Sequence, residues 1–230
     1  MGGKRQLVQY AFYKADPAWR RLPSGQKESD RKEFLKVVEE FAPRLAVQRA
    51  YSLIGVRGDV DFLLWNITED LDTLQDMAAR LQKTGLGMWL TSPYRYLAMT
   101  RQSMYIKGHQ HEGQEGSRTR VTVKGSKYLF VYPFVKTRAW YKLPMADRHK
   151  MMGVHFKVGH DFPNVYIHTA YSYGLDDQEF MLGFETDSPS DFLDLVMVLR
   201  DTEASSYTER DVPIFTCVAQ DLPKILNDLG

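Results

Sequence analysis

Residues that could hold and oxidise an aromatic ligand alternate along one predicted strand. In the stretch VYPFVK, Tyr132, Phe134 and Lys136 occupy every second position, so their side chains face the same side, and Trp140 follows shortly afterwards. A phenol, an ammonium group and an indole on one wall could bind a carboxylate-bearing aromatic ligand, with the phenol as a redox-active group. The alternative is an ordinary packed face of a sheet.

A histidine also lies among apolar residues on a predicted helix, MADRHKMMGVHFKVGH. Its three- and four-residue spacing places four side chains on one face: Met151, Met152, His155 and Val158. Such a histidine is either a core residue satisfied by a backbone carbonyl or an axial ligand of a haem iron in an apolar pocket. His149 and His160 are interpreted as surface or helix-end residues.

Cations precede the aromatic strand in the stretch KGHQHEGQEGSRTRVTVKGSK, which carries Arg118, Arg120 and Lys124. Several cations beside a large aromatic pocket suit a ligand with carboxylates, although the same residues could be solvated linker positions. Because the stretch is polar and rich in glycine, we interpret it as a crossover between two lobes.

The composition limits the class of protein. The 230 residues are 43% hydrophobic, which suits one large domain or two of about 110 residues. A net charge of +1 indicates neither a nucleic acid nor an acidic membrane surface as partner. The single cysteine, Cys217, excludes an internal disulfide and a cysteine-cluster metal site. We expect no membrane span and no signal peptide, and therefore a reducing cytoplasm.

The elements that must position these residues occur twice. QYAFYKADPAWRRLP (9–23) and VYPFVKTRAWYKLP (131–144) each contain an aromatic strand, a basic residue, a Trp and a Leu-Pro pair. A helix, two strands and a second helix follow each copy, and the turns GDVDF and LDDQEF match Phe62 with Phe180. With a final strand at about 92–105 or 213–219, each half is a ferredoxin-like α+β unit.

The predicted fold class is therefore α+β, a dimeric α+β barrel built from two tandem ferredoxin-like (βαββαβ) repeats. We predict an N-terminal lobe at 1–107, a linker at 108–126 and a C-terminal lobe at 127–230. Further expectations are a strand over 47–56 and helices over 71–81 and 145–158. The function is assigned to the C-terminal lobe, because the N-terminal copy has Ala11 in place of Tyr132 and contains no histidine.

Four segments, in this order, resemble the chlorite dismutase family: YPFVKTRAWYKLP, MMGVH, YSYGLDDQEFMLGFE and LRDTEASSYTERDVPIF. Within that family the chain is most similar to the coproheme decarboxylases of bacterial haem synthesis. The resemblance implies a cytoplasmic homopentamer of α+β barrels that binds iron coproporphyrin III (coproheme) non-covalently in its C-terminal lobe. It also implies oxidative decarboxylation to haem b with hydrogen peroxide, and a transient contact with the coproporphyrin ferrochelatase.

The resemblance further implies roles for particular residues. His155 matches the proximal iron ligand, and Tyr132 matches the tyrosine whose radical abstracts hydrogen from the reacting propionate. Lys136 matches the lysine beside that tyrosine, and Trp140 falls at or next to a tryptophan of the haem pocket. Three residues match groups that hold propionates: Arg118, Tyr105 and Ser205.

The position opposite the iron separates the activities within the family. Chlorite-splitting members carry an arginine seven residues before the glycine of the GLDD-type turn, where this chain has Ile167. An isoleucine cannot bind an oxyanion such as chlorite. Counting forward from His155 gives His168 instead, and strand alternation lets only one of these two side chains face the iron. Actinobacterial-type decarboxylases have a small apolar residue there and use a distal histidine as the peroxide base, a role for His109, His111 or His168.

Other functions fit parts of the same pattern. Within the family, the alternatives are a chlorite dismutase and a haem peroxidase. From a different class, the alternatives are a non-catalytic haem-binding or haem-sensing protein and a structural barrel without a cofactor, because a fold alone does not define a function. Tyr132 discriminates between them, because a sensor has no need of an oxidisable phenol at that position.

Overall fold

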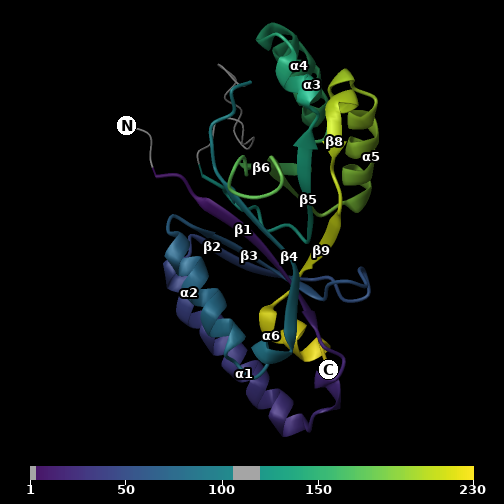
Figure 1. Ribbon diagram of the computed structural model, residues 1–230. Helices are drawn as coiled ribbons and strands as arrows, with labels where there is room; N and C mark the ends of the chain where they lie inside the picture. Colours follow the sequence, from purple (N-terminus) through teal and green to yellow (C-terminus); the bar gives the residue numbers. More distant parts are fainter. Residues whose placement is uncertain (1–3, 106–119) are drawn as a thin grey trace. The chain divides into compact units, whose positions relative to one another are not determined.

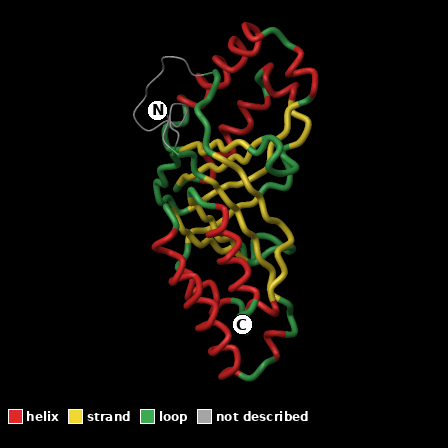
Figure 2. Tube along the Cα trace, turned by 60° about the vertical axis from the view of Figure 1, so that its left-hand side comes forward, coloured by secondary structure: helices red, strands yellow, loops and turns green. Residues whose placement is uncertain are grey.

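The computed structural model describes residues 4–105 and 120–230. The chain divides into two compact units, one formed by Met1–Leu97 with Cys217–Gly230 and the other by Ala98–Thr216. Both units combine helices with β-strands (Figures 1 and 2), and the strands pair antiparallel. The predicted α+β fold class is therefore confirmed. The closure of two sheets into one barrel stays a prediction.

The first unit contains a sheet with strand order β4-β1-β3-β2-β9, in which β1 and β2 both pair antiparallel with β3. Its strands are β1 (Leu7–Ala15), β2 (Val47–Ser52), β3 (Phe62–Thr68), β4 (Leu90–Met99, whose last two residues belong to the second unit) and β9 (Phe215–Ala219, whose first two residues belong to the second unit). Its helices are α1 (Ser24–Phe41), α2 (Leu71–Gln82) and α6 (Leu222–Asp228), with short 3-10 turns η1 (Trp19–Arg21), η2 (Ala42–Arg44) and η3 (Gly87–Trp89).

The apolar face of α1 builds the core of the first unit. Phe34 and Phe41 are fully or almost fully buried and pack in one cluster with Phe62 of β3 and Leu81 of α2. This is the face that the three- and four-residue spacing predicts. Asp30, also buried, accepts a hydrogen bond from the Trp19 indole at 2.9 Å and so anchors η1 to α1.

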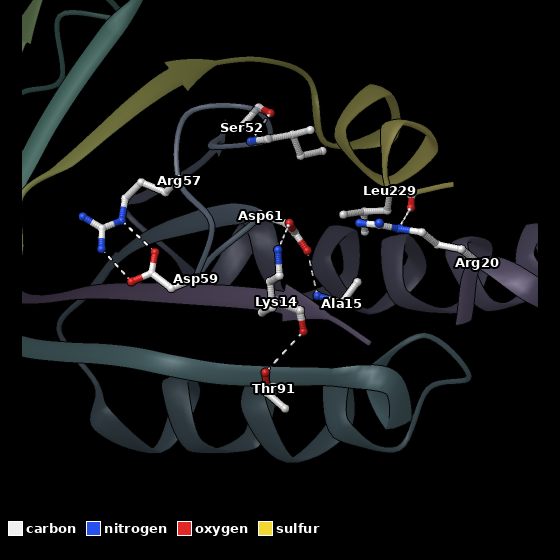
Figure 3. Close-up of polar contacts among 10 residues, drawn as sticks. Lys14, Ala15, Arg20, Ser52, Arg57, Asp59, Asp61, Thr91 and Leu229 are labelled. Carbon is white, nitrogen blue, oxygen red and sulfur yellow. Dashed lines mark hydrogen bonds and ion pairs between the residues drawn. The ribbon is translucent and has the colours of Figure 1, made fainter. Parts of the chain in front are cut away.

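The connection between β2 and β3 is held by polar contacts (Figure 3). Arg57 forms two hydrogen bonds with Asp59, at 2.8 and 2.6 Å. The Asp61 carboxylate accepts hydrogen bonds from the Lys14 ammonium at 2.7 Å and from the Ala15 amide at 2.9 Å. These bonds fix the end of β1. The strand predicted over 47–56 ends earlier, at Ser52, because a turn with Gly55 at a φ of 78° follows it.

The second unit contains the strand order β6-β7-β5-β8, and its neighbouring strands are antiparallel. Its strands are β5 (Tyr128–Lys136), β6 (Tyr166–Tyr171), β7 (Phe180–Thr186) and β8 (Thr208–Arg210). Its helices are α3 (Arg138–Lys142), α4 (Met145–His160) and α5 (Pro189–Arg200), followed by the 3-10 helix η5 (Glu203–Tyr207). The Ser188 side chain caps α5 by accepting the Asp191 amide, as the Ser/Asp-rich segment predicts.

The register of the sheets supports the internal duplication. In the first unit Tyr13 pairs with Phe62, and in the second Phe134 pairs with Phe180, the residue that the sequence matches to Phe62. The two halves therefore use the same strand pairing at the same positions.

The compact units differ from the predicted lobes at the end of the chain. Residues 217–230 belong to the first unit, because β9 pairs with β2 through Tyr51 and Ala219 and because α6 packs against α1. The strand predicted over 92–105 ends at Met99.

Candidate functional site

A cavity of about 910 Å³ lies in the second unit. This volume is near the upper end of the roughly 300–1,000 Å³ that ligand pockets occupy, so a large ligand fits. Strand alternation gives the cavity an apolar wall, formed by Phe134, Ile167, Phe180, Leu182 and Phe184. Helices α4 and α5 and the 3-10 helix η5 supply the remaining walls.

Tyr132 lies on this wall at the middle of β5, with 7% of its surface exposed. Its ring stacks on Phe184 with centroids 5.6 Å apart and an interplanar angle of 12°. Within 4–105 and 120–230 no residue hydrogen-bonds to its hydroxyl group. Burial raises the pKa of Tyr132 and the nearby Asp211 adds to the effect, so the phenol keeps its proton at neutral pH.

Lys136 lies on the same wall at the end of β5 and is 8% exposed. Its ammonium group donates a 2.6 Å hydrogen bond to the Ala204 carbonyl and lies 4.7 Å from the centre of the Trp140 ring. Burial lowers the pKa of Lys136 to about 8, although the charge of Glu179 opposes the shift. The lysine is therefore a cation that can lose its charge slightly above neutral pH.

His155 reaches the cavity from helix α4. Burial lowers its pKa to about 4, and the positive charge of Lys136 contributes to the shift, so the imidazole is neutral at physiological pH. In the described part of the chain, the His155 ring has no hydrogen-bond partner. A neutral imidazole nitrogen that faces a cavity can bind a metal ion through its lone pair.

Aromatic and polar residues close one end of the cavity. Trp140 of α3, which is 2% exposed, packs against Tyr207 and Tyr105 with ring centroids 5.5 and 6.3 Å apart. Tyr105, Trp140 and Ser205 all line the cavity. The structure thus brings together seven of the predicted site residues: Tyr105, Tyr132, Lys136, Trp140, His155, Ile167 and Ser205. Their roles remain predictions.

Ile167 and His168 occupy opposite faces of β6. Ile167 lines the cavity, whereas the His168 Nε2 atom lies 2.7 Å from Glu185 Oε2, and both of these residues are buried. His168 is therefore engaged in a buried pair on the other face of the sheet. The other candidate distal bases, His109 and His111, lie outside the described residues, as does Arg118.

Glu185 also fixes the segment that leads into β5. Its carboxylate accepts the backbone amides of Lys124 and Gly125 at 2.9 Å each. The Lys124 side chain lines the cavity, with its ammonium 4.6 Å from the centre of the Tyr166 ring. Burial alone would raise the pKa of Glu185, but the hydrogen bonds from His168 and these amides lower it overall.

The variant Glu185→Ala is expected to lose about 3–5 kcal/mol of unfolding free energy, because it removes the buried partner of His168 and the acceptor of two partly buried backbone amides. Since the folded pKa of Glu185 is below its ordinary value of 4.5, its contribution is fully present above that value and disappears as the pH falls through the folded pKa. Urea unfolding at several pH values measures both effects. The matched control is Glu209→Ala, an exposed acid, and an equal loss in the two variants would contradict this role.

Four basic residues that the sequence did not assign to the site also line the cavity: Arg101, Lys157, His160 and Arg200. His160 does end α4, as predicted, but it also faces the cavity. Arg200 forms an ion pair with Asp211, the one acid among the described lining residues. The spacing of Met152, Phe156 and His160 along α4 is the signal that could have added His160 to the site.

The described residues contain no group of three or more His, Cys, Asp or Glu side chains that could hold a metal ion by themselves. No described helix combines the length and the apolar character that crossing a membrane requires.

The sequence pattern of the chlorite dismutase family matches residues 27–220, so this chain belongs to the chlorite dismutase family. Among curated proteins, it is similar to the coproheme decarboxylase of Mycolicibacterium smegmatis. The two are 29% identical over 184 residues, which cover 80% of this chain and 76% of the relative.

Solved structures share the fold. A mutant chlorite dismutase from Candidatus Nitrospira defluvii superposes with a TM-score of 0.89 at 22% identity, covering 97% of this chain and 95% of that one. A heme-binding protein from Thermus thermophilus gives a TM-score of 0.87 at 24% identity, covering 98% of this chain and 95% of that one. At these identities the likeness establishes the fold alone.

Proposed function

We propose that this protein catalyses the hydrogen-peroxide-dependent oxidative decarboxylation of iron coproporphyrin III to haem b. The observation that carries the proposal is that one cavity receives Tyr132 from the sheet and His155 from the facing helix. The first is a protonated phenol and the second a neutral imidazole. The similarity to the mycobacterial coproheme decarboxylase supports the same assignment.

The residues present fit an iron porphyrin that bears several carboxylates. The apolar wall suits a flat aromatic macrocycle, and the neutral His155 imidazole suits the iron. The cationic groups suit the propionates, because charge-assisted hydrogen bonds to carboxylates are the strong ones. These groups are Arg101, Lys124, Lys136, Lys157 and Arg200.

The iron porphyrin, as both substrate and redox centre, supplies the oxidising chemistry with hydrogen peroxide. Tyr132 gives up an electron and its phenolic proton, and the resulting phenoxyl radical takes a hydrogen atom from the β-carbon of the adjacent propionate. Loss of one further electron and of carbon dioxide leaves a vinyl group. Each round consumes one hydrogen peroxide and releases one carbon dioxide and two waters, and two rounds give haem b.

Lys136 and Ser205 position the carboxylates in this scheme, and Trp140 and Tyr105 enclose the same end of the cavity. Holding the propionate next to the Tyr132 hydroxyl converts binding energy into the correct reacting geometry. The absence of a hydrogen-bond partner for that hydroxyl among the described residues leaves it directed to the substrate. The hydrogen atom is thus exchanged with the propionate.

Ile167 argues against chlorite as the substrate. Its side chain lines the cavity where chlorite-splitting relatives are expected to carry an arginine, and an alkyl group cannot stabilise an oxyanion. Two assays on the purified protein test the choice. Loaded with iron coproporphyrin III, it should form haem b on addition of peroxide; loaded with haem b, it should evolve no oxygen from chlorite. The reverse pattern would overturn the proposal in favour of chlorite dismutation.

Affinity for iron coproporphyrin III should fall as the pH rises above about 8, because Lys136 then loses the charge that holds a propionate. A lost charge-assisted hydrogen bond costs about 1.5–3 kcal/mol, or about tenfold to a hundredfold in affinity. Porphyrin titrations from about pH 7 to pH 9.5 measure the effect. In Lys136→Arg, whose guanidinium stays charged, the decrease should disappear; an unchanged decrease in this variant would assign it to another group.

Three expectations about the cellular setting follow from the family. We expect a homopentamer, a location in the cytoplasm, and a transient contact with the coproporphyrin ferrochelatase that supplies the porphyrin. A non-catalytic haem-binding protein is the second candidate, since the heme-binding protein of Thermus thermophilus has the same fold. Peroxide treatment separates the two, because such a protein would bind the porphyrin and leave it unchanged.

A further inference from the structure

Glu179, the residue directly before β7, has a structural role that both units share. Its carboxylate accepts the backbone amide of Lys136 at 2.8 Å, at the end of β5. In the first unit Asp61 accepts the amide of Ala15 at 2.9 Å in the same way, at the end of β1 (Figure 3). Because the register of the two sheets is the same, these acids are equivalent, and each fixes the end of a strand.

The second unit adds two phenols to this shared acid. The Tyr141 hydroxyl lies 2.5 Å from the Glu179 carboxylate and 2.6 Å from the Tyr173 hydroxyl. In the first unit Arg20 stands in the place of Tyr141, directly after the repeated Trp, and its guanidinium donates instead to the Leu229 carbonyl at 3.0 Å (Figure 3). The phenols are therefore not needed to fix the strand, and they occur in the unit that contains the cavity.

The two phenols connect the cavity wall with the surface. Trp140, the residue before Tyr141, lines the cavity. The Tyr173 ring lies 5.1 Å from that of Phe180, which also lines the cavity, while Tyr173 itself is 47% exposed. A chain of oxidisable side chains thus runs from Trp140 through Tyr141 to a tyrosine that solvent reaches.

We propose that Tyr141 and Tyr173 form an exit by which oxidising equivalents leave the cavity when they do not react with substrate. The inference rests on the proposed function, since the peroxide reaction supplies the oxidant. One electron passes from Tyr141 to a Trp140 radical cation, which returns to a neutral indole. The Tyr141 proton moves to Glu179 Oε2, leaving a neutral phenoxyl radical and a protonated carboxyl group.

The remaining steps restore the network. Tyr173 transfers a hydrogen atom across the 2.6 Å contact to Tyr141 and becomes the phenoxyl radical. A thiol or ascorbate in solution then gives one electron to the exposed Tyr173, which takes a proton from solvent, and Glu179 releases the proton it received. The net result is that one solution reductant is oxidised in place of a cavity side chain.

The proton acceptor distinguishes this exit from the proposed catalytic phenol. A phenol loses an electron more readily when a base is in place to take its proton. Tyr141 has the Glu179 carboxylate at 2.5 Å, whereas the Tyr132 hydroxyl has no hydrogen-bond partner among the described residues. Tyr132 therefore exchanges hydrogen with the substrate, and Tyr141 drains oxidising equivalents that remain.

The test is radical trapping in protein loaded with haem b, the proposed product, so that decarboxylation does not compete. Hydrogen peroxide is added with a nitroso spin trap, and adducts and oxidised side chains are located by peptide mass spectrometry. In the wild type we expect adducts on Tyr141 and Tyr173. In Tyr141→Phe we expect the Tyr173 adduct to fall to the level without peroxide, while oxidation of Trp140 and Met152 rises several-fold. Adding a thiol should suppress the Tyr173 adduct.

The matched control is Tyr128→Phe, a tyrosine of β5 that does not line the cavity, and it should retain the wild-type pattern. An identical pattern in the wild type and in Tyr141→Phe would overturn the exit and leave the decarboxylase proposal intact. Glu179→Gln, which keeps an acceptor for the Lys136 amide but takes up no proton, should behave as Tyr141→Phe. A protein that takes up no haem would overturn both proposals.

Discussion

The variant Tyr132→Phe is expected to lose turnover of iron coproporphyrin III by roughly a thousandfold or more, which corresponds to about 4 kcal/mol in the activation barrier. Phenylalanine preserves the ring that stacks on Phe184 at 5.6 Å, so the cavity wall keeps its shape. It lacks the O–H group that exchanges hydrogen with the propionate. Binding should change by no more than about tenfold, because at most one hydrogen bond is lost.

Single-turnover absorbance measurements with peroxide separate these two quantities. The control is Tyr128→Phe, which removes a phenol from the same strand outside the cavity and should turn over as the wild type does. Full turnover by Tyr132→Phe would contradict the assigned role and favour another oxidant in the cavity. Loss of both binding and turnover would instead indicate that the hydroxyl holds the substrate.

The variant His155→Ala is expected to lose the axial ligand of the iron. Removing groups that merely support a metal ligand costs about 10–100-fold, so loss of the ligand itself should lower affinity for iron coproporphyrin III by at least about a hundredfold. The neutral state of the ring, with its pKa lowered to about 4, predicts that ligation persists down to about pH 5 in the wild type. Absorbance titration with the iron porphyrin measures both properties.

Added imidazole provides a specific control for this variant. It should enter the space left by the His155 side chain and restore the absorbance spectrum of the ligated iron. His149→Ala should behave as the wild type, because His149 does not line the cavity and its ring nitrogens hydrogen-bond to the carbonyls of Met145 and Met104. An unchanged spectrum in His155→Ala would transfer the ligand role to another residue, and His160 would be the first to test.

Local patterns predicted the parts of the site that depend on a single element. The alternation of Tyr132, Phe134 and Lys136 placed all three on one face of β5, and the structure confirms that they line one cavity. The spacing along the second-half helix placed His155 with Met152 on the inner face of α4. The repeated motifs also predicted that Phe62 and Phe180 occupy equivalent positions, which the strand register confirms.

Features that depend on distant segments could not be predicted in this way. Alternation showed that only Ile167 or His168 faces the cavity, but the choice depends on the pairing of His168 with Glu185, a residue of the neighbouring strand. Arg101 and Arg200 resemble solvated charges at the ends of elements, and only tertiary packing brings them to the cavity. The same holds for residues 217–230, which return to the first unit after the whole of the second.

Mass spectrometry of the bound porphyrin shows directly whether the protein decarboxylates iron coproporphyrin III. Purified protein is loaded with iron coproporphyrin III, and hydrogen peroxide is added in measured steps. We expect two successive mass losses, each of one carbon dioxide plus two hydrogen atoms, with a singly decarboxylated intermediate and haem b as the end product. Tight binding of a porphyrin whose mass stays unchanged at every peroxide addition would contradict it.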